Sequence, residues 1–189
     1  MWGKPGHGCD AMKLAFPTTD QTPSVTRIRL ATAVDLPRIQ EIHLQSCLPE
    51  IERGVPHPSG PKDWDTWWKS HTPTQHPVWV HEEDGEVLAW SSLSPLYRRK
   101  AFRSTVQCSI YVAPEAQRRG IGTRLVTHLM EECPTLGIRT VLAFISPRNE
   151  ASLKIFHRAG LLPWGNFPAI DAAPHTDAMD VVMLGRTID

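Results

Sequence analysis

The chain has 189 residues, a length that suits one domain with its own hydrophobic core and is short for two catalytic domains. Apolar residues make up 41% and charged residues 21%, which excludes a largely disordered or fibrous chain, and no apolar run approaches the roughly 20 residues that span a bilayer. Because 20 basic residues balance 20 acidic ones, no broad field favours nucleic acid or an anionic membrane, and we expect neither as a partner.

The N-terminal residues 1–24 are rich in glycine and proline and lack both a periodic apolar pattern and the apolar core of a secretory signal. We expect a flexible leader at 1–24, a single domain at 25–189, and a cytoplasmic location. The four cysteines are Cys9, Cys47, Cys108 and Cys133. Their dispersed positions, with no histidine at zinc-ligand spacing, predict reduced structural thiols and no metal site.

The first expected elements are a strand at 25–30 and a helix that runs through Leu44. Thr32, followed three residues later by Asp35, resembles a capping box at the start of this helix. Proline and glycine then interrupt the chain at 49–61. The tryptophans at 64, 67 and 68 recur at helical spacing, and their shared face either packs on the core or walls a substrate site.

Strands are expected next at 78–81, 86–92 and 105–112, with an Asp84-Gly85 hairpin signal between the first two. These three strands predict an antiparallel meander. An amphipathic helix from Ile121 ends before Pro134, and a strand at 140–145, a helix at 149–159 and a strand at 181–184 complete the chain. The pattern predicts a mixed α/β sheet with helices packed on it.

The stretch 109–123 carries the strongest chemical signal, because a strand is followed by a short turn and a glycine-rich helix start. Amides at a helix N-terminus lack partners within the helix, and glycines let a phosphate approach the backbone. Leu125 stands where a dinucleotide fingerprint needs glycine, and the Gly-Lys-Ser/Thr of a P-loop is absent, so both motifs are excluded. An anion site and a merely structural tight turn remain the two interpretations.

Residues 117–122, Gln-Arg-Arg-Gly-Ile-Gly, resemble the Gln/Arg-x-x-Gly-x-Gly/Ala motif of the GNAT superfamily of N-acetyltransferases, and residues 149–161 resemble its Asn-x-x-Ser/Ala helix. The resemblance covers about residue 25 to the C-terminus. It implies the GNAT fold, an α/β (α+β) architecture with a mixed, largely antiparallel central sheet that is splayed between its fourth and fifth strands and flanked by helices. It also implies acetyl-CoA as co-substrate.

In that family the turn amides bind the pyrophosphate, and the preceding strand pairs with the pantetheine amides. The positions that the resemblance assigns to acetyl-CoA are Ile110, Tyr111, Val112, Gln117, Arg118, Arg119, Gly120, Ile121, Gly122, Thr123, Asn149, Ser152 and Phe156. Asn149 is also suited to cap its own helix, which is the structural alternative for this position.

Residues 105–112 and 175–181 look most like the phosphinothricin and methionine sulfone or sulfoximine acetyltransferases, which acetylate the α-amine of small amino-acid analogues. The acid group of such an acceptor needs a bidentate guanidinium, and Arg99 and Arg103 are the candidates. The resemblance further implies direct attack of the amine without a metal, with the Val112 amide holding the oxyanion, and a possible homodimer.

Two positions depart from the family pattern. Gln107 stands where the phosphinothricin group has a glutamate, and glutamine cannot accept the proton of an ammonium, although it could orient a water molecule. His175, which matches a histidine of that group, becomes the favoured base. Phe156 replaces a tyrosine that often protonates the leaving thiolate. A peptide or protein N-terminal acetyltransferase and a non-catalytic acyl-CoA-binding module remain the alternatives, and His71 and His76 are expected to be surface residues.

Overall fold

The computed structural model describes residues 25–52, 63–97, 99–171 and 179–188. The predicted leader at 1–24 and the predicted base His175 lie outside these residues.

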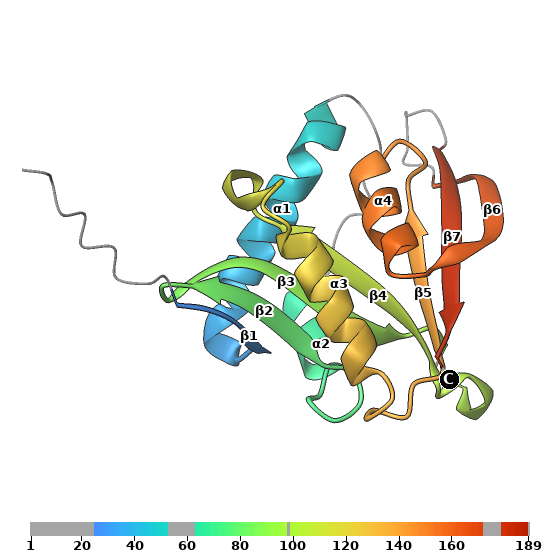
Figure 1. Ribbon diagram of the computed structural model, residues 1–189, viewed down its shortest axis with the longest axis horizontal. Helices are drawn as coiled ribbons and strands as arrows, with labels where there is room; N and C mark the ends of the chain where they lie inside the picture. The colour runs from blue at the N-terminus through green and yellow to red at the C-terminus, as the bar shows by residue number, and fades with distance from the viewer. Residues whose placement is uncertain (1–24, 53–62, 98, 172–178, 189) are drawn as a thin grey trace, which may run out of the picture.

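Seven strands form one sheet in the order β1-β2-β3-β4-β5-β7-β6 (Figure 1). The strands are β1 (Thr26–Leu30), β2 (Val78–Glu83), β3 (Glu86–Pro95), β4 (Thr105–Val112), β5 (Thr140–Ile145), β6 (Leu162–Asp171) and β7 (Met179–Thr187). Every neighbouring pair is antiparallel except β4 and β5, which run parallel. The predicted mixed and largely antiparallel sheet is therefore confirmed.

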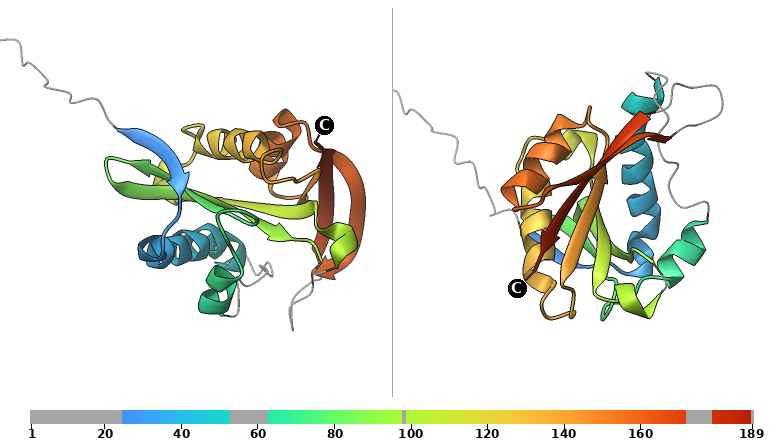
Figure 2. Two further views of the ribbon diagram at one scale, coloured as in Figure 1. Left: turned by 90° about the horizontal axis from the view of Figure 1, so that it is seen from below. Right: turned by 90° about the vertical axis from the view of Figure 1, so that its right-hand side faces the viewer.

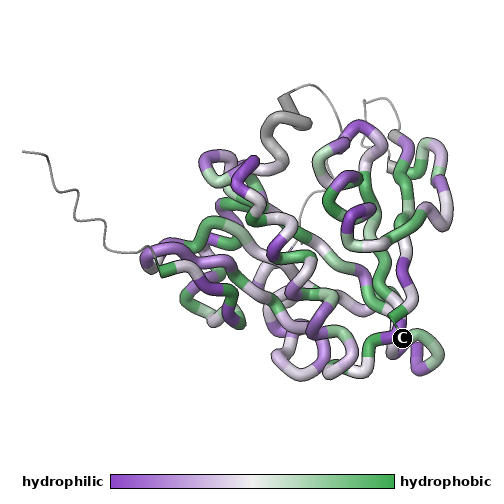
Figure 3. Tube along the Cα trace, in the orientation of Figure 1, coloured by the Kyte–Doolittle hydropathy of each residue, from purple (hydrophilic) through white to green (hydrophobic). Residues whose placement is uncertain are grey.

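Four helices cover the sheet, α1 (Leu36–Glu52) and α2 (Trp64–Lys69) on one face, and α3 (Ile121–Glu132) and α4 (Glu150–Arg158) on the other (Figure 2). Short 3-10 turns, η1 (Ala33–Asp35), η2 (Lys100–Phe102) and η3 (Pro114–Ala116), lead into α1, β4 and the start of α3. Apolar and polar residues are interspersed along the helices (Figure 3), and α1, α3 and α4 each bury apolar side chains in the core, whereas the tryptophans of α2 are half-buried.

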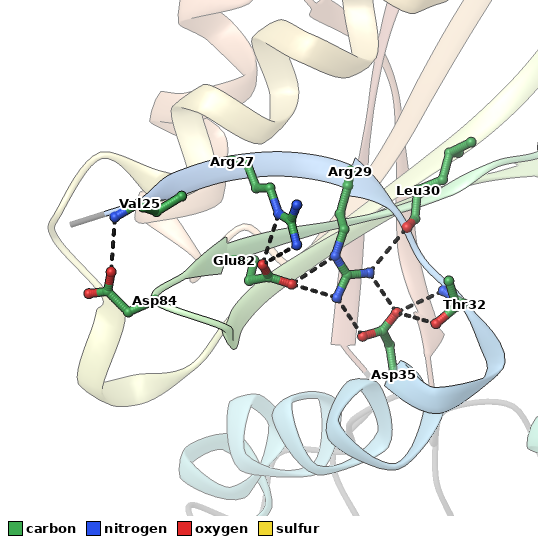
Figure 4. Close-up of polar contacts among 8 residues, drawn as sticks. All are labelled: Val25, Arg27, Arg29, Leu30, Thr32, Asp35, Glu82 and Asp84. Atoms are coloured by element: carbon green, nitrogen blue, oxygen red, sulfur yellow. Dashed lines mark hydrogen bonds and ion pairs between the residues drawn. The ribbon is translucent and has the colours of Figure 1, made fainter. Parts of the chain in front are cut away.

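The edge strand β1 is held by an ion-pair network that also fixes the start of α1 (Figure 4). Glu82 on β2 accepts from Arg27 and Arg29 at 2.7 Å each, and Arg29 also bonds Asp35 at 2.8 Å. The Thr32 amide donates to Asp35 at 2.7 Å, in keeping with the predicted capping box. Together with the Thr32 contacts, the Arg29 guanidinium lowers the pKa of Asp35 to about 2.

Two elements differ from the sequence expectations. The strand β6 was not predicted, because Pro163, Gly165 and Pro168 interrupt its pattern. It lies at the sheet edge and pairs only with β7. Its prolines, which have no backbone N–H to donate, are tolerated there because the outer side of the strand has no neighbour to bond. The helix α1 continues past Leu44 to Glu52, through the proline at which we expected the chain to be interrupted.

The sheet splits in the middle. β4 and β5 pair only from Thr105 to Gln107 on β4 and from Thr140 to Leu142 on β5. β4 continues to Val112 while β5 pairs onward with β7, and the two strands diverge in Figures 1 and 2. The predicted splay between the fourth and fifth strands is thus confirmed, and β4 beyond Gln107 keeps an edge with no strand beside it.

Candidate active site

The register between β3 and β4 decides which backbone groups face this unpaired edge. The Ala113 amide donates to Leu88, and the Leu96 amide donates to Thr105, so the odd-numbered residues of β4 direct their backbone groups toward β3. The even-numbered residues point the other way. Ile110 and Val112 therefore present their amides to the unpaired edge, whereas the backbone of Tyr111 faces β3.

The turn between η3 and α3 is exposed from Gln117 to Gly120. Arg118 and Gly120 adopt left-handed φ angles of 60° and 78°, and Gly120 is the N-cap of α3 without a side-chain cap. The first helical bond runs from the Arg124 amide to Gly120, and in the described chain the amides of residues 118–123 donate to no protein acceptor. The amides of the exposed residues 118–120 are therefore open to an anion, whereas Ile121 and Gly122 lie buried at the start of the helix.

The two glycines of the motif serve different purposes. A Cβ at Gly120 would meet no atom within 4 Å, so glycine suits this position because of its left-handed backbone and the open space above it. A Cβ at the buried Gly122 would lie 3.0 Å from Ile155 Cδ1 and 3.7 Å from Val112 Cγ2. Gly122 therefore allows α3 to pack closely against α4 and β4.

The charged residues of the turn are not equivalent. Arg119 pairs with Glu83 of β2, which also contacts His81 Nε2 at 3.0 Å and Arg124 at 3.7 Å. The bond from His81, together with the Arg119 charge, lowers the pKa of Glu83. Gln117 donates from Nε2 to the Val112 carbonyl at 3.4 Å and so caps the end of β4.

The second motif forms the start of α4. The Asn149 side chain accepts from the Ser152 amide at 3.0 Å, which is the helix cap that its residue type allows. Phe156 is 3% exposed and belongs to the core cluster that contains Leu129 and Leu184. Its ring therefore stabilises the packing of α4 on the sheet, and it has no proton to give.

The face of β3 and β4 that points away from α3 and α4 carries a row of polar and aromatic side chains. Trp90, Ser92 and Ser94 lie directly across from Tyr111, Ser109 and Gln107. Trp90 and Tyr111 belong to the cluster that contains Ile39, Ile42 and the α2 tryptophans, so these pairs, spaced by two along their strands, lie on the face covered by α1 and α2. The α2 tryptophans are half-buried, and Trp67 packs its ring 5.6 Å from that of Trp90, as the core-facing interpretation predicts.

Arg99 and Arg103 flank η2 in the connection that leads into β4, and both are exposed. Neither guanidinium has a hydrogen bond or ion pair with the rest of the described chain. Both arginines are therefore available to an acidic ligand. Gln107 is half-buried on β4, four residues beyond Arg103.

His71, expected at the surface, is instead half-buried in a polar contact with β3. Its Nδ1 lies 2.7 Å from the Trp67 carbonyl, and its Nε2 lies 3.1 Å from Ser94 Oγ. Burial lowers the pKa of His71, and the charge of His76 lowers it further, against the opposite effect of the Trp67 carbonyl. The sequence alone gave no signal for this contact, because it depends on the placement of the segment after α2.

Cys108 and Cys133 are free and buried, and burial raises the pKa of each to about 12. Both are therefore protonated thiols. Among residues 25–52, 63–97, 99–171 and 179–188 there is no group of three or more His, Cys, Asp or Glu side chains arranged to hold a metal. The helices in those same ranges include none that is long and apolar enough to cross a membrane.

Comparisons with known proteins agree with this geometry. The family model described as Acetyltransferase (GNAT) family matches residues 37–161. YwnH of Bacillus subtilis, classed as a phosphinothricin acetyltransferase, is 34% identical over 162 residues, which cover 85% of this chain and 98% of YwnH. The L-methionine sulfoximine/L-methionine sulfone acetyltransferase of Salmonella typhimurium is 31% identical over 55% of this chain and 61% of its own length.

A solved structure extends the likeness to the fold. The phosphinothricin acetyltransferase of Sinorhizobium meliloti, crystallised with acetyl-CoA, superposes with a TM-score of 0.75 at 27% identity, covering 86% of this chain and 88% of that one. The family model spans well over half of the present sequence and includes both motifs. This chain therefore belongs to the GNAT family of acetyltransferases.

Proposed function

We propose that this enzyme transfers the acetyl group of acetyl-CoA to the primary amine of a small amino-acid-like acceptor. The observation that carries the proposal is the unpaired edge of β4, which leads directly into a turn whose amides, from residue 118 to 123, have no acceptor in the described chain. The acceptor class rests on the two relatives named for phosphinothricin and for methionine sulfoximine and sulfone.

The residues present suit the co-substrate. The amides of residues 118–123 would bind its diphosphate, with Arg118 adding charge, and the amides of Ile110 and Val112 would pair with an extended ligand along β4. Five residues separate Val112 from Gln107, about 16 Å of extended strand. A ligand that begins at the turn and follows β4 would therefore bring its acyl end near Gln107, where the splay begins.

When bound, acetyl-CoA supplies an activated acetyl thioester. The enzyme's part is to hold amine and thioester in attacking geometry, an effect worth up to several kcal/mol. In this proposal an amide on the unpaired edge of β4 near the splay donates to the carbonyl oxygen as charge develops on it, which contributes about 3 kcal/mol. The predicted donor, the Val112 amide, lies at the turn end of β4, about 16 Å from Gln107, and would pair with the extended part of the ligand instead. Because Phe156 cannot protonate the leaving sulfur, the thiol would leave as its anion, which its ordinary pKa of about 8.5 allows.

On the acceptor side, Arg99 and Arg103 would hold the acid group by bidentate bonds, and Gln107 would orient the amine or a water molecule beside it. His175 remains the predicted base of the phosphinothricin group pattern. The enzyme would act in the cytoplasm as a possible homodimer, which cell fractionation and light scattering would test.

The test is release of free CoA from acetyl-CoA in the presence of separate amines. The panel contains phosphinothricin, methionine sulfoximine, neutral and acidic L-amino acids, and a peptide with a free N-terminus. We expect release that depends on the small acceptors. Release with the peptide alone would favour an N-terminal acetyltransferase, whereas acetyl-CoA binding without release for any amine would favour a binding module and refute the proposal.

A further inference from the structure

The contact between His71 and Ser94 places a basic group close to Gln107, which cannot itself act as a base. Acetyl transfer needs a neutral amine, so a protein group must take a proton from the acceptor's ammonium. Gln107 has no basic atom, and Ser94 lies directly across from it on the neighbouring strand. Directly opposed residues of antiparallel strands have Cβ atoms about 5 Å apart, so the Ser94 hydroxyl lies beside the Gln107 side chain.

The hydrogen bonds of His71 assign its tautomer. The Trp67 carbonyl can only accept, so Nδ1 at 2.7 Å carries the proton and donates it. Nε2 is then the basic nitrogen, and it accepts from the Ser94 hydroxyl at 3.1 Å. The Trp67 ring packs against the imidazole with ring centroids 4.2 Å apart, which fixes the orientation of the pair.

We propose that Ser94 and His71 form a proton relay that replaces the missing carboxylate base of this site, an inference that rests on the proposed function. Ser94 Oγ accepts a proton from the acceptor's ammonium as its own hydroxyl proton moves to His71 Nε2. The products of this step are a neutral amine, an intact hydroxyl and an imidazolium whose Nδ1–H remains bonded to the Trp67 carbonyl. The half-buried imidazole then returns the proton to solvent. Ser94 contacts the substrate, and His71 acts through it.

The surroundings of His71 keep its imidazole neutral near neutral pH. Its burial and the charge of His76 both lower its pKa from the ordinary value of 6.5. The facing side chains of β3 and β4, Ser94 and Gln107, do not titrate, and the charged residues of α2, Asp65 and Lys69, are exposed. The imidazole is therefore ready to accept a proton over the range in which most amines are still protonated.

The test compares kcat between pH 6 and pH 9 at saturating acetyl-CoA and methionine sulfoximine, or whichever amine of the panel reacts best. In the wild-type enzyme we expect kcat to be flat above the pKa of His71. In His71→Gln and in Ser94→Ala we expect kcat near pH 7 to fall about 100-fold and then to rise tenfold per pH unit, because only the fraction of bound acceptor whose amine is already neutral can react. Ser94→Thr keeps a hydroxyl and should restore most of the rate.

His76→Gln is the matched control, since it removes a neighbouring histidine that makes no hydrogen bond to Ser94 in the described chain. It should keep the flat profile and move the acid limb slightly upward, because the charge that lowers the His71 pKa is gone. Calorimetric affinity for acetyl-CoA should be equal in all four variants and shows that each is folded.

A flat profile in His71→Gln or Ser94→Ala would overturn the relay, as would a tenfold rise per pH unit that appears only in His175→Gln. Both results presuppose an active wild-type enzyme, so they leave the proposed function standing. A wild-type enzyme that binds acetyl-CoA but releases no CoA with any amine would instead overturn both.

Discussion

Gly120 and Gly137 offer a matched pair of substitutions that separates ligand binding from folding. Both have left-handed φ angles, 78° and 68°, both are exposed, and a Cβ at either one would meet no atom within 4 Å. An alanine at either position therefore costs the folded chain about 1–2 kcal/mol of backbone strain. At about 2–4 °C per kcal/mol for a chain of this size, each variant should melt some 2–8 °C below the wild type.

The two positions lie beyond opposite ends of α3. Gly120 is the N-cap in the turn with the available amides, whereas Gly137 follows the C-terminal end of the helix. A methyl group at residue 120 would occupy the space through which a diphosphate reaches those amides. We expect Gly120→Ala to bind acetyl-CoA at least tenfold more weakly, a loss of about 1.4 kcal/mol, and Gly137→Ala to bind it as the wild type does.

Isothermal titration with acetyl-CoA and thermal melts of the free proteins measure the two effects separately. If both variants melt at the same temperature and both bind acetyl-CoA as tightly as the wild type does, the turn does not bind the diphosphate. Equal weakening in both would mean that affinity follows overall stability and not the local geometry.

Three further predictions concern the acceptor site, the core and the acid response. Arg103→Ala should raise KM for carboxylated acceptors several-fold without changing acetyl-CoA affinity, and equal loss for neutral and acidic amines would exclude the bidentate role. Gly122→Val should lower the free energy of unfolding by about 2 kcal/mol, because the new side chain clashes with Ile155 Cδ1. Ile155→Val removes that atom, so a double-mutant cycle measured by chemical denaturation should show that it recovers part of the lost stability. Because the pKa of Asp35 is lowered to about 2, its ion pair stabilises the fold above pH 4 and is lost as the pH falls toward 2. Asp35→Asn should therefore lower the free energy of unfolding by about 1–2 kcal/mol at pH 7, after allowance for solvent screening, and should make stability less dependent on pH between 4 and 2. An acid-unfolding curve identical to that of the wild type would mean that other groups carry the acid response.

Local signals predicted the elements that build the cofactor side. Asp84-Gly85 predicted the hairpin between β2 and β3, and both residues have the positive φ angles, 50° and 86°, that such a turn requires. The strands at 105–112 and 140–145 have the predicted bounds. The turn at 117–122 was found by its spacing, because glycine and the helix start are adjacent in the chain.

Contacts between distant segments could not be predicted in this way. His71 meets Ser94 across 23 residues, and only the β3–β4 register shows that Ser94 faces Gln107. Arg119 and Glu83 are 36 residues apart in the sequence, and their contact likewise depends on how distant segments pack in the fold. The strand β6 was missed because its prolines read as loop, and only its place at the sheet edge makes them acceptable.

The contact between Arg119 and Glu83 has a consequence for how the turn responds to ionic strength. Glu83 compensates the charge of Arg119, and its partner Arg124 also lies within 4 Å of the same carboxylate. Because one carboxylate offsets part of the positive charge of the turn, attraction for an anion at this place depends on oriented peptide dipoles together with the exposed charge of Arg118. Dissolved salt screens exposed ions strongly and short dipolar contacts weakly, so acetyl-CoA affinity should fall with rising sodium chloride less steeply than three uncompensated arginines would require.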